Sequence, residues 1–136
     1  MNQQGRLQVQ HELQQLFHAV QQQGAQALPR ILQALRSRPE DPNLLHLAGL
    51  ASAAGDDLQQ AANYYRQSLS RYARQPEVLN NLANACQKLG LAQDAENHYR
   101  KALSLNQGYL DAWKNLGLLY LSESRYDEAR QALAKA

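Results

Sequence analysis

Five carboxylates stand at positions where acid–base chemistry is conceivable. They are Asp56, Asp57, Asp94, Asp127 and Glu128. Read alone, any of them could supply one half of a general acid/base pair. Each one, however, comes where a helix is expected to begin, and a carboxylate there caps the helix and opposes its dipole. Ser124 and Asp127 also have the spacing of a capping box. We therefore interpret these carboxylates as helix-start residues and predict no catalytic residue.

The four histidines and the single cysteine do not form a recognisable site. The histidines are His11, His18, His46 and His98. None is at metal-ligand spacing from another ligand type on a defined helix face, so we predict no metal. Cys86 has no neighbouring base, and we expect a buried structural thiol rather than a nucleophile. Phosphate-loop, serine-hydrolase and zinc-protease motifs are absent as well, so the sequence predicts neither an enzyme nor a cofactor.

A step of 34 residues links positions of matched size along the chain. The step joins Leu45, Leu79 and Trp113; Gly49, Ala83 and Gly117; Ala61, Ala95 and Ala129; and Tyr65, Tyr99 and Leu133. Within a unit, apolar residues recur at the spacing of one helix face, first over residues 113–120 and then at Tyr126, Ala129 and Leu133. Each unit is therefore expected to be two antiparallel helices, which cross closely where the residues are small. We expect the large residues to fill the space between hairpins.

The last unit resembles the tetratricopeptide repeat. Trp113, Leu116, Gly117 and Tyr120, followed by Ala129, match that family's pattern at its period of about 34 residues. The resemblance implies an all-α fold, a right-handed superhelical stack of antiparallel helix hairpins with about eight helices. Such a solenoid presents a concave groove lined by the first helix of each hairpin.

One repeat domain is expected over residues 1–136. Its parts are a degenerate leading repeat over 1–41, repeats over 42–75 and 76–109, and a last repeat, incomplete at its end, over 110–136. In the leading repeat, Leu13, Leu16, Phe17 and Val20 are expected to form the apolar face of the first helix. That register requires a hairpin turn about two residues shorter than the others. Pro29 is compatible with the first turn of the second helix.

The concave groove is the candidate binding site, and its lining follows from the resemblance. The candidate residues are Asn43, Leu47 and Leu50 in the first full repeat, Glu77, Asn81, Asn84 and Lys88 in the second, and Asp111, Asn115 and Leu118 in the third.

Asn81 and Asn115, 34 residues apart, are expected to stack along the groove. An asparagine offers a donor and an acceptor, so the pair could hold the main chain of an extended peptide, as in family members with asparagine ladders. The other interpretation, polar residues on a solvated helix face, stays open. A clamp for a C-terminal carboxylate is not expected, because Glu77 and Asp111 place negative charge there.

The sequence therefore predicts a non-catalytic interaction module or scaffold that binds a protein or peptide segment in its groove. A second hypothesis is the N-terminal arm of a longer bacterial enzyme, because residues 44–50, preceded by Pro39 and Pro42, are similar to the repeat arms of bacterial sulfotransferases and glycosyltransferases. A third is self-assembly as a homodimer through an exposed C-terminal repeat, where Leu118, Leu119 and Tyr120 are expected to lie open.

Composition narrows the partner class. Hydrophobic residues make up 44% of the chain and charged residues 19%, as in a globular protein. The net charge of +2, with both signs interspersed, predicts no nucleic-acid partner. No stretch has the roughly 18 to 20 apolar residues of a membrane span, and no signal peptide is recognisable, so we expect a cytoplasmic protein without a membrane partner.

Overall fold

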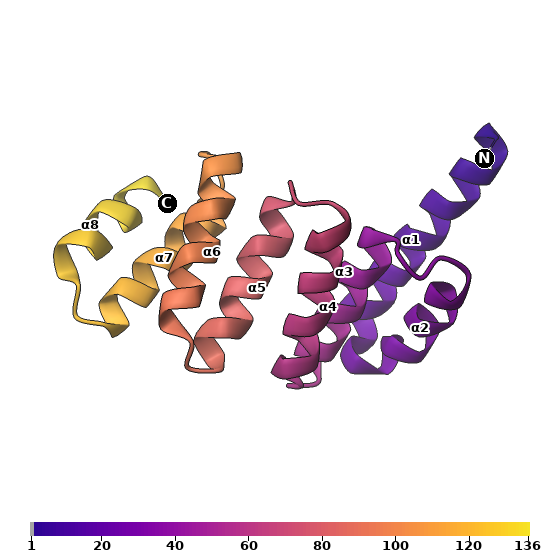
Figure 1. The fold of residues 1–136 in the computed structure, drawn as a ribbon, viewed down its shortest axis with the longest axis horizontal. Helices are drawn as coiled ribbons and strands as arrows, with labels where there is room; N and C mark the ends of the chain where they lie inside the picture. The colour runs from indigo at the N-terminus through magenta and orange to yellow at the C-terminus, as the bar shows by residue number, and fades with distance from the viewer. Residues whose placement is uncertain (1) are drawn as a thin grey trace. The chain divides into compact units, whose positions relative to one another are not determined.

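The computed structural model describes residues 2–136, which form eight α-helices and one short 3-10 helix (Figure 1). No β-strand is present within these residues. The all-helical fold and the expected number of helices are confirmed. The chain divides into two compact units, one ending at Arg71 and one starting at Tyr72, which are described separately.

The first unit contains the degenerate repeat and one complete hairpin. Its helices are α1 (Gln3–Gln23), η1 (Gly24–Ala27), α2 (Leu28–Ser37), α3 (Pro42–Ala54) and α4 (Leu58–Arg71). Helix α3 packs against α4 on one side and against α1, η1 and α2 on the other. Asp41 caps α3, because its Oδ1 accepts hydrogen bonds from the backbone N–H groups of Asn43 (2.9 Å) and Leu44 (3.4 Å), and Pro42 occupies the first turn.

The register of the degenerate repeat is partly as predicted. Pro29 lies in the first turn of α2, and Gly24 ends α1 with a left-handed φ of 58°. Leu16 is buried, with Leu13 and Val20 packed against the core, but Phe17 is 46% exposed. Including Phe17 in the apolar face was wrong. It is rotated about 100° around the helix from Leu16, whereas the buried face continues through Ala19.

The second unit consists of two helix hairpins. Its helices are α5 (Pro76–Lys88), α6 (Ala92–Leu105), α7 (Leu110–Ser122) and α8 (Tyr126–Lys135). Helix α5 pairs with α6 and α7 pairs with α8, while α7 also packs against α6 and α5 (Figure 1). Leu79, Leu82, Tyr99 and Leu116 are buried in its interior. Tyr126 is 65% exposed, contrary to its predicted place in the apolar stripe, because it is the first residue of α8 and the buried face starts at Ala129.

The hairpins α3–α4, α5–α6 and α7–α8 close with the same backbone turn. Each has a residue in the left-handed region, namely Asp56 (φ 63°), Gly90 (φ 82°) and Ser124 (φ 61°). The N–H of the next residue donates to the carbonyl five residues earlier in the chain, at 2.8–2.9 Å. The three bonds run from Asp57 to Ser52, from Leu91 to Cys86 and from Arg125 to Tyr120. Gly24 comes 32 residues before Asp56, so the first turn is two residues shorter, as predicted.

The residues of these hairpin turns show which side chains cap the helix that follows. Asp57 Oδ1 accepts from the N–H of Gln60 at 3.1 Å, which confirms a capping role at the start of α4. Ser124 does not cap α8. It belongs to the left-handed turn that ends α7, and the N-cap position of α8 is occupied by Arg125, so the capping-box prediction was wrong.

Candidate functional site

A polar cavity lies where α5 and α7 meet, within the second unit. Its volume is about 490 Å³, and it is lined by Asn84, Gln87 and Lys88 of α5 and by Asn115 of α7. Three of these four residues were predicted to line the groove. Gln87 was missed, although it neighbours Lys88 and lies one helical turn beyond Asn84, so the helical repeat alone could have included it. We call this surface the α5–α7 polar face.

Hydrogen bonds from within the unit orient the asparagine of α5. The Tyr99 hydroxyl of α6 donates to Asn84 Oδ1 and lies 3.2 Å from Gln87 Oε1. Burial raises the pKa of Tyr99 well above its usual range, so this hydroxyl remains a donor. Because the Asn84 oxygen is engaged by Tyr99, its NH₂ group is the part that a ligand can meet.

Asn115 of α7 uses the other end of its amide group, the NH₂, in a hydrogen bond within the unit. Asn115 Nδ2 donates to Oδ1 of Asn80 at 3.1 Å, and Asn80 is almost fully buried. Burial raises the pKa of the neighbouring Tyr109, and the nearby carboxylates of Glu77 and Asp111 raise it further. Asn84 thus uses its oxygen and Asn115 its NH₂ group in hydrogen bonds within the unit, so opposite ends of the two amides are engaged.

The stacking of Asn81 with Asn115 stays a prediction. Asn115 bonds to Asn80 and shares the cavity with Asn84, whereas Asn81 is not among the residues that line it. The contact of α7 with α5 places Asn115 beside Asn80. The 34-residue period of the sequence does not by itself say which side chains of the two helices meet. Glu77 and Asp111 are exposed beside Tyr109, and Leu118 is 46% exposed on α7.

The candidate residues of the first unit do not form a comparable surface. Asn43 is exposed, but Leu47 is only 5% exposed and Leu50 is packed against the core of its unit. The burial of Leu47 contradicts its assignment to an open groove, whereas the assignment of Asn43 stays a prediction. Helix α3 is apolar nearly all round, and such a helix is covered on all sides, here by α1, α2 and α4.

The cysteine and the possible metal ligands were also placed by the structure. Cys86 is fully buried, as expected for a packing thiol. Within residues 2–136, no group of three or more His, Cys, Asp or Glu residues is placed to hold a metal ion. None of the helices in this described part is long and apolar enough to cross a membrane.

Comparison with protein families identifies the fold. Two models described as tetratricopeptide repeat match the chain, one over residues 18–76 and one over residues 74–136. The chain belongs to the tetratricopeptide repeat family. This confirms the resemblance drawn from the residues of the last unit, and the match that begins at residue 18 includes the later part of the leading repeat.

The chain is similar to proteins described as photosystem I assembly protein Ycf3. It is 31% identical to the one from Rippkaea orientalis over 113 residues, which is 80% of this chain and 64% of that protein. It is 33% identical to the one from Prochlorococcus marinus over 92 residues, which is 65% of this chain and 53% of that protein. The chain thus spans less than two thirds of the length of these relatives.

Solved structures agree on the fold. MamA matches with a TM-score of 0.83 at 18% identity, covering 93% of this chain and 75% of MamA. The tetratricopeptide domain of Sgt2 from Aspergillus fumigatus matches with a TM-score of 0.67 at 29% identity, covering 69% of this chain and 62% of that domain. Both comparisons support the helix-hairpin repeat architecture.

Proposed function

We propose that this protein is a non-catalytic binding module whose α5–α7 polar face holds the main chain of an extended protein segment. The observation that carries the proposal is the opposed orientation of two amides. Asn84 presents NH₂ because Tyr99 engages its oxygen, and Asn115 presents oxygen because Asn80 engages its NH₂. A peptide unit carries one acceptor and one donor, so it complements this pair without requiring a particular side chain.

Two further features support this function. Lys88 is exposed at the same cavity and adds a cationic donor, which suits a carbonyl or a carboxylate of the bound segment. The similar proteins from Rippkaea orientalis and Prochlorococcus marinus are described as assembly proteins, a role that requires holding other proteins. We extend only that general role to this chain, as a scaffold for a protein partner.

The experiment is a selection from a random-peptide display library on the immobilised protein, followed by calorimetry of the selected peptides. The key variant is Asn84→Asp. It keeps the oxygen that accepts from Tyr99 but replaces the outward NH₂ with a second oxygen. Losing one neutral hydrogen bond of ~0.5–1.5 kcal/mol should weaken binding about two- to tenfold.

Two controls make the result specific. Asn97→Asp introduces the same charge at an exposed position of α6, where the asparagine Oδ1 only accepts from Gln93 at 3.2 Å, and should leave affinity unchanged. Peptides N-methylated on alternate backbone nitrogens should lose affinity for the parent protein. Equal affinity of Asn84→Asp and parent, or no effect of N-methylation, would rule out main-chain binding at this face.

Self-association is a second candidate, and one observation favours it. Leu118 and Leu121, about one helical turn apart on α7, are 46% and 42% exposed and so present two neighbouring apolar side chains. The neighbouring Leu119 and Tyr120 are buried, so the predicted open surface is smaller than expected. Sedimentation equilibrium tests the idea: a dimer mass that Leu118→Asp returns to the monomer mass supports it, and a monomer at all concentrations rejects it.

A further inference from the structure

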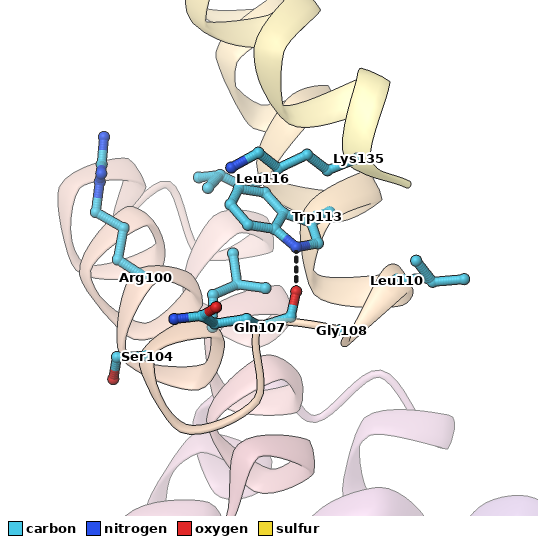
Figure 2. Close-up of a pocket in the computed structure, with 9 residues that line it drawn as sticks. Arg100, Ser104, Gln107, Gly108, Leu110, Trp113, Leu116 and Lys135 are labelled. Carbon is cyan, nitrogen blue, oxygen red and sulfur yellow. Dashed lines mark hydrogen bonds between the residues drawn. The ribbon is translucent and has the colours of Figure 1, made fainter.

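A groove separate from the α5–α7 polar face lies between α6 and α8. Two adjoining cavities of about 580 and 540 Å³ both include Arg100, Trp113, Leu116 and Lys135 in their lining, so they form one continuous groove. Figure 2 shows the first cavity, with Trp113 and Leu116 of α7 between Arg100 and Ser104 of α6 and Lys135 of α8. We call the continuous groove formed by both cavities the Trp113 groove.

The floor of the Trp113 groove is apolar and open. In the two earlier repeats the position of Trp113 is occupied by Leu45 and Leu79, which are buried, whereas Trp113 is only half-buried. Its indole Nε1 donates to the backbone carbonyl of Gln107 at 2.8 Å, so the polar edge of the ring is satisfied, and Lys135 lies over one face of the ring (Figure 2). Leu110, at the end of the groove, is 57% exposed.

The charges around this floor are positive. Among the described residues that line the first cavity, Arg100 and Lys135 are the charged ones, and neither Asp nor Glu is present. Lys135 Nζ lies 4.4 Å from the centre of the Trp113 ring. The second cavity adds Glu128, but Arg125 Nη2 binds that carboxylate at 2.7 Å and lowers its pKa. The groove therefore combines an apolar floor with Arg100 on one wall, Lys135 on the other, and one carboxylate, Glu128, in its second cavity.

Arg100 is held in place before any ligand arrives. Its Nε donates to Glu96 Oε2 at 2.9 Å, and its Nη2 donates to the Tyr120 hydroxyl at 2.6 Å. Arg100 Nη2 also lies 3.9 Å from Glu128 Oε2, so the Arg100 charge is already shared with two carboxylates. A guanidinium has five N–H donors, and those that Glu96 and Tyr120 do not use remain for an incoming carboxylate. A prearranged cation costs less conformational entropy on binding than a mobile one.

We propose that the Trp113 groove binds an acidic protein segment in which a bulky apolar side chain is flanked by carboxylates. The apolar side chain would pack on Trp113 and Leu116, and the carboxylates would pair with Arg100 on one wall and Lys135 on the other. Tryptophan and arginine are the residue types that contribute most strongly when buried by a partner. This is a second binding surface, and it does not depend on main-chain binding at the polar face.

The test uses Trp113, the only tryptophan of the chain, as a fluorescent reporter. The probe is the peptide Glu-Asp-Leu-Phe-Asp-Glu, acetylated and amidated at its ends, and its neutral counterpart is Gln-Asn-Leu-Phe-Asn-Gln. The acidic peptide should change the emission saturably and bind at least ten times more tightly than the neutral one. Emission that does not respond saturably to the acidic peptide, or equal binding of both peptides, overturns the proposal.

Charge-reversed variants locate the site. Lys135→Glu should weaken the acidic peptide about tenfold or more, whereas Lys101→Glu, at an exposed position of α6 outside the groove lining, should change its affinity less than twofold. Ser104→Asp places a carboxylate on the other wall without altering α8 and should weaken binding similarly. Equal weakening by Lys101→Glu would reveal general charge attraction and overturn the assignment. Asn84→Asp should leave this binding unchanged, which separates this result from the test of the polar face.

Discussion

Gly117 of α7 lies so close to Leu133 of α8 that the glycine has no room for a side chain. A Cβ at Gly117 would be 2.6 Å from Leu133 Cγ and 3.4 Å from the Leu133 backbone nitrogen. The equivalent pair in the first unit, Gly49 and Tyr65, is in the same relation. Tyr65 and Leu133, which occupy the same position in their repeats, therefore fill space within their own hairpins and not only the space between hairpins.

Gly117→Leu should destabilise the protein severely. Overpacking a close helix crossing costs ~1–3 kcal/mol or more, and here the α8 backbone lies behind the clashing side chain. Denaturant unfolding measures the loss. Adding Leu133→Ala should recover part of it, because the smaller residue makes room. Gly108→Ala is the control, since its Cβ would meet only the Asn106 side chain at 3.6 Å. A Gly117→Leu variant as stable as the parent would contradict the observed contact.

Asn115→Ala should cost stability as well as affinity. The side chain donates to Asn80, whose oxygen is in the interior, and a buried acceptor that loses its donor costs ~1–3 kcal/mol. Asn43→Ala, at an exposed position of α3, should stay within about 0.5 kcal/mol of the parent. Thermal or denaturant unfolding of the two variants decides the matter, and equal stability would show that the Asn115–Asn80 bond contributes nothing.

Glu96 joins three helices of the second unit through its carboxylate. Arg125 Nη1 binds its Oε1 at 2.7 Å, and the Tyr120 hydroxyl donates to its Oε2 at 3.0 Å. The hydrogen bond from Arg125 is the main cause that lowers the pKa of Glu96 to about 2, against the opposing effect of burial. Glu96→Gln removes a buried partner of two arginines and should cost ~3 kcal/mol at neutral pH.

The pH dependence of that loss has a defined sign. Because the folded pKa of Glu96 is below its unfolded value, its stabilisation is present above about pH 4.5 and is lost as the pH falls towards 2. The difference in unfolding free energy between the parent and Glu96→Gln should therefore shrink through this window. A constant difference from pH 5 to pH 2 would contradict the role of the charged form.

The repeat architecture was predictable because it depends on residue size at a fixed period. Small residues at Gly49, Ala83 and Gly117, and alanines at the facing positions, are visible in the sequence and are sufficient to predict hairpins. The left-handed turn residues were harder to predict. Gly90 signals its turn, but Asp56 and Ser124 occupy the same backbone conformation without being glycine.

The candidate site was predictable only in part, because a helix pattern says which way a residue points and not what covers it. Asn84, Lys88 and Asn115, three of the residues predicted for the groove, line one cavity. Leu47 has the same repeat position as Asn81 but is buried, because α1 and α2 cover α3. The Trp113 groove was not predicted, since it depends on the distance between α6 and α8, which no local pattern encodes.

His46 should make the protein less stable in mild acid. The ring lies in the first unit with its centroid 6.0 Å from that of Tyr65, and burial lowers its pKa to about 4. In the unfolded chain a histidine takes up a proton near pH 6.5, whereas folded His46 resists it until about pH 4. Acid therefore favours the unfolded state between these values, and the unfolding free energy falls by up to ~1.4 kcal/mol per pH unit.

His46→Leu should flatten the pH dependence of the unfolding free energy between pH 6.5 and pH 4, while His18→Gln, at an exposed position of α1, should keep the slope of the parent. Because the Glu96 window lies below pH 4.5, denaturant unfolding at pH 7, 5.5 and 4.5 isolates the histidine. The same slope in His46→Leu and in the parent would show that another group takes up the proton.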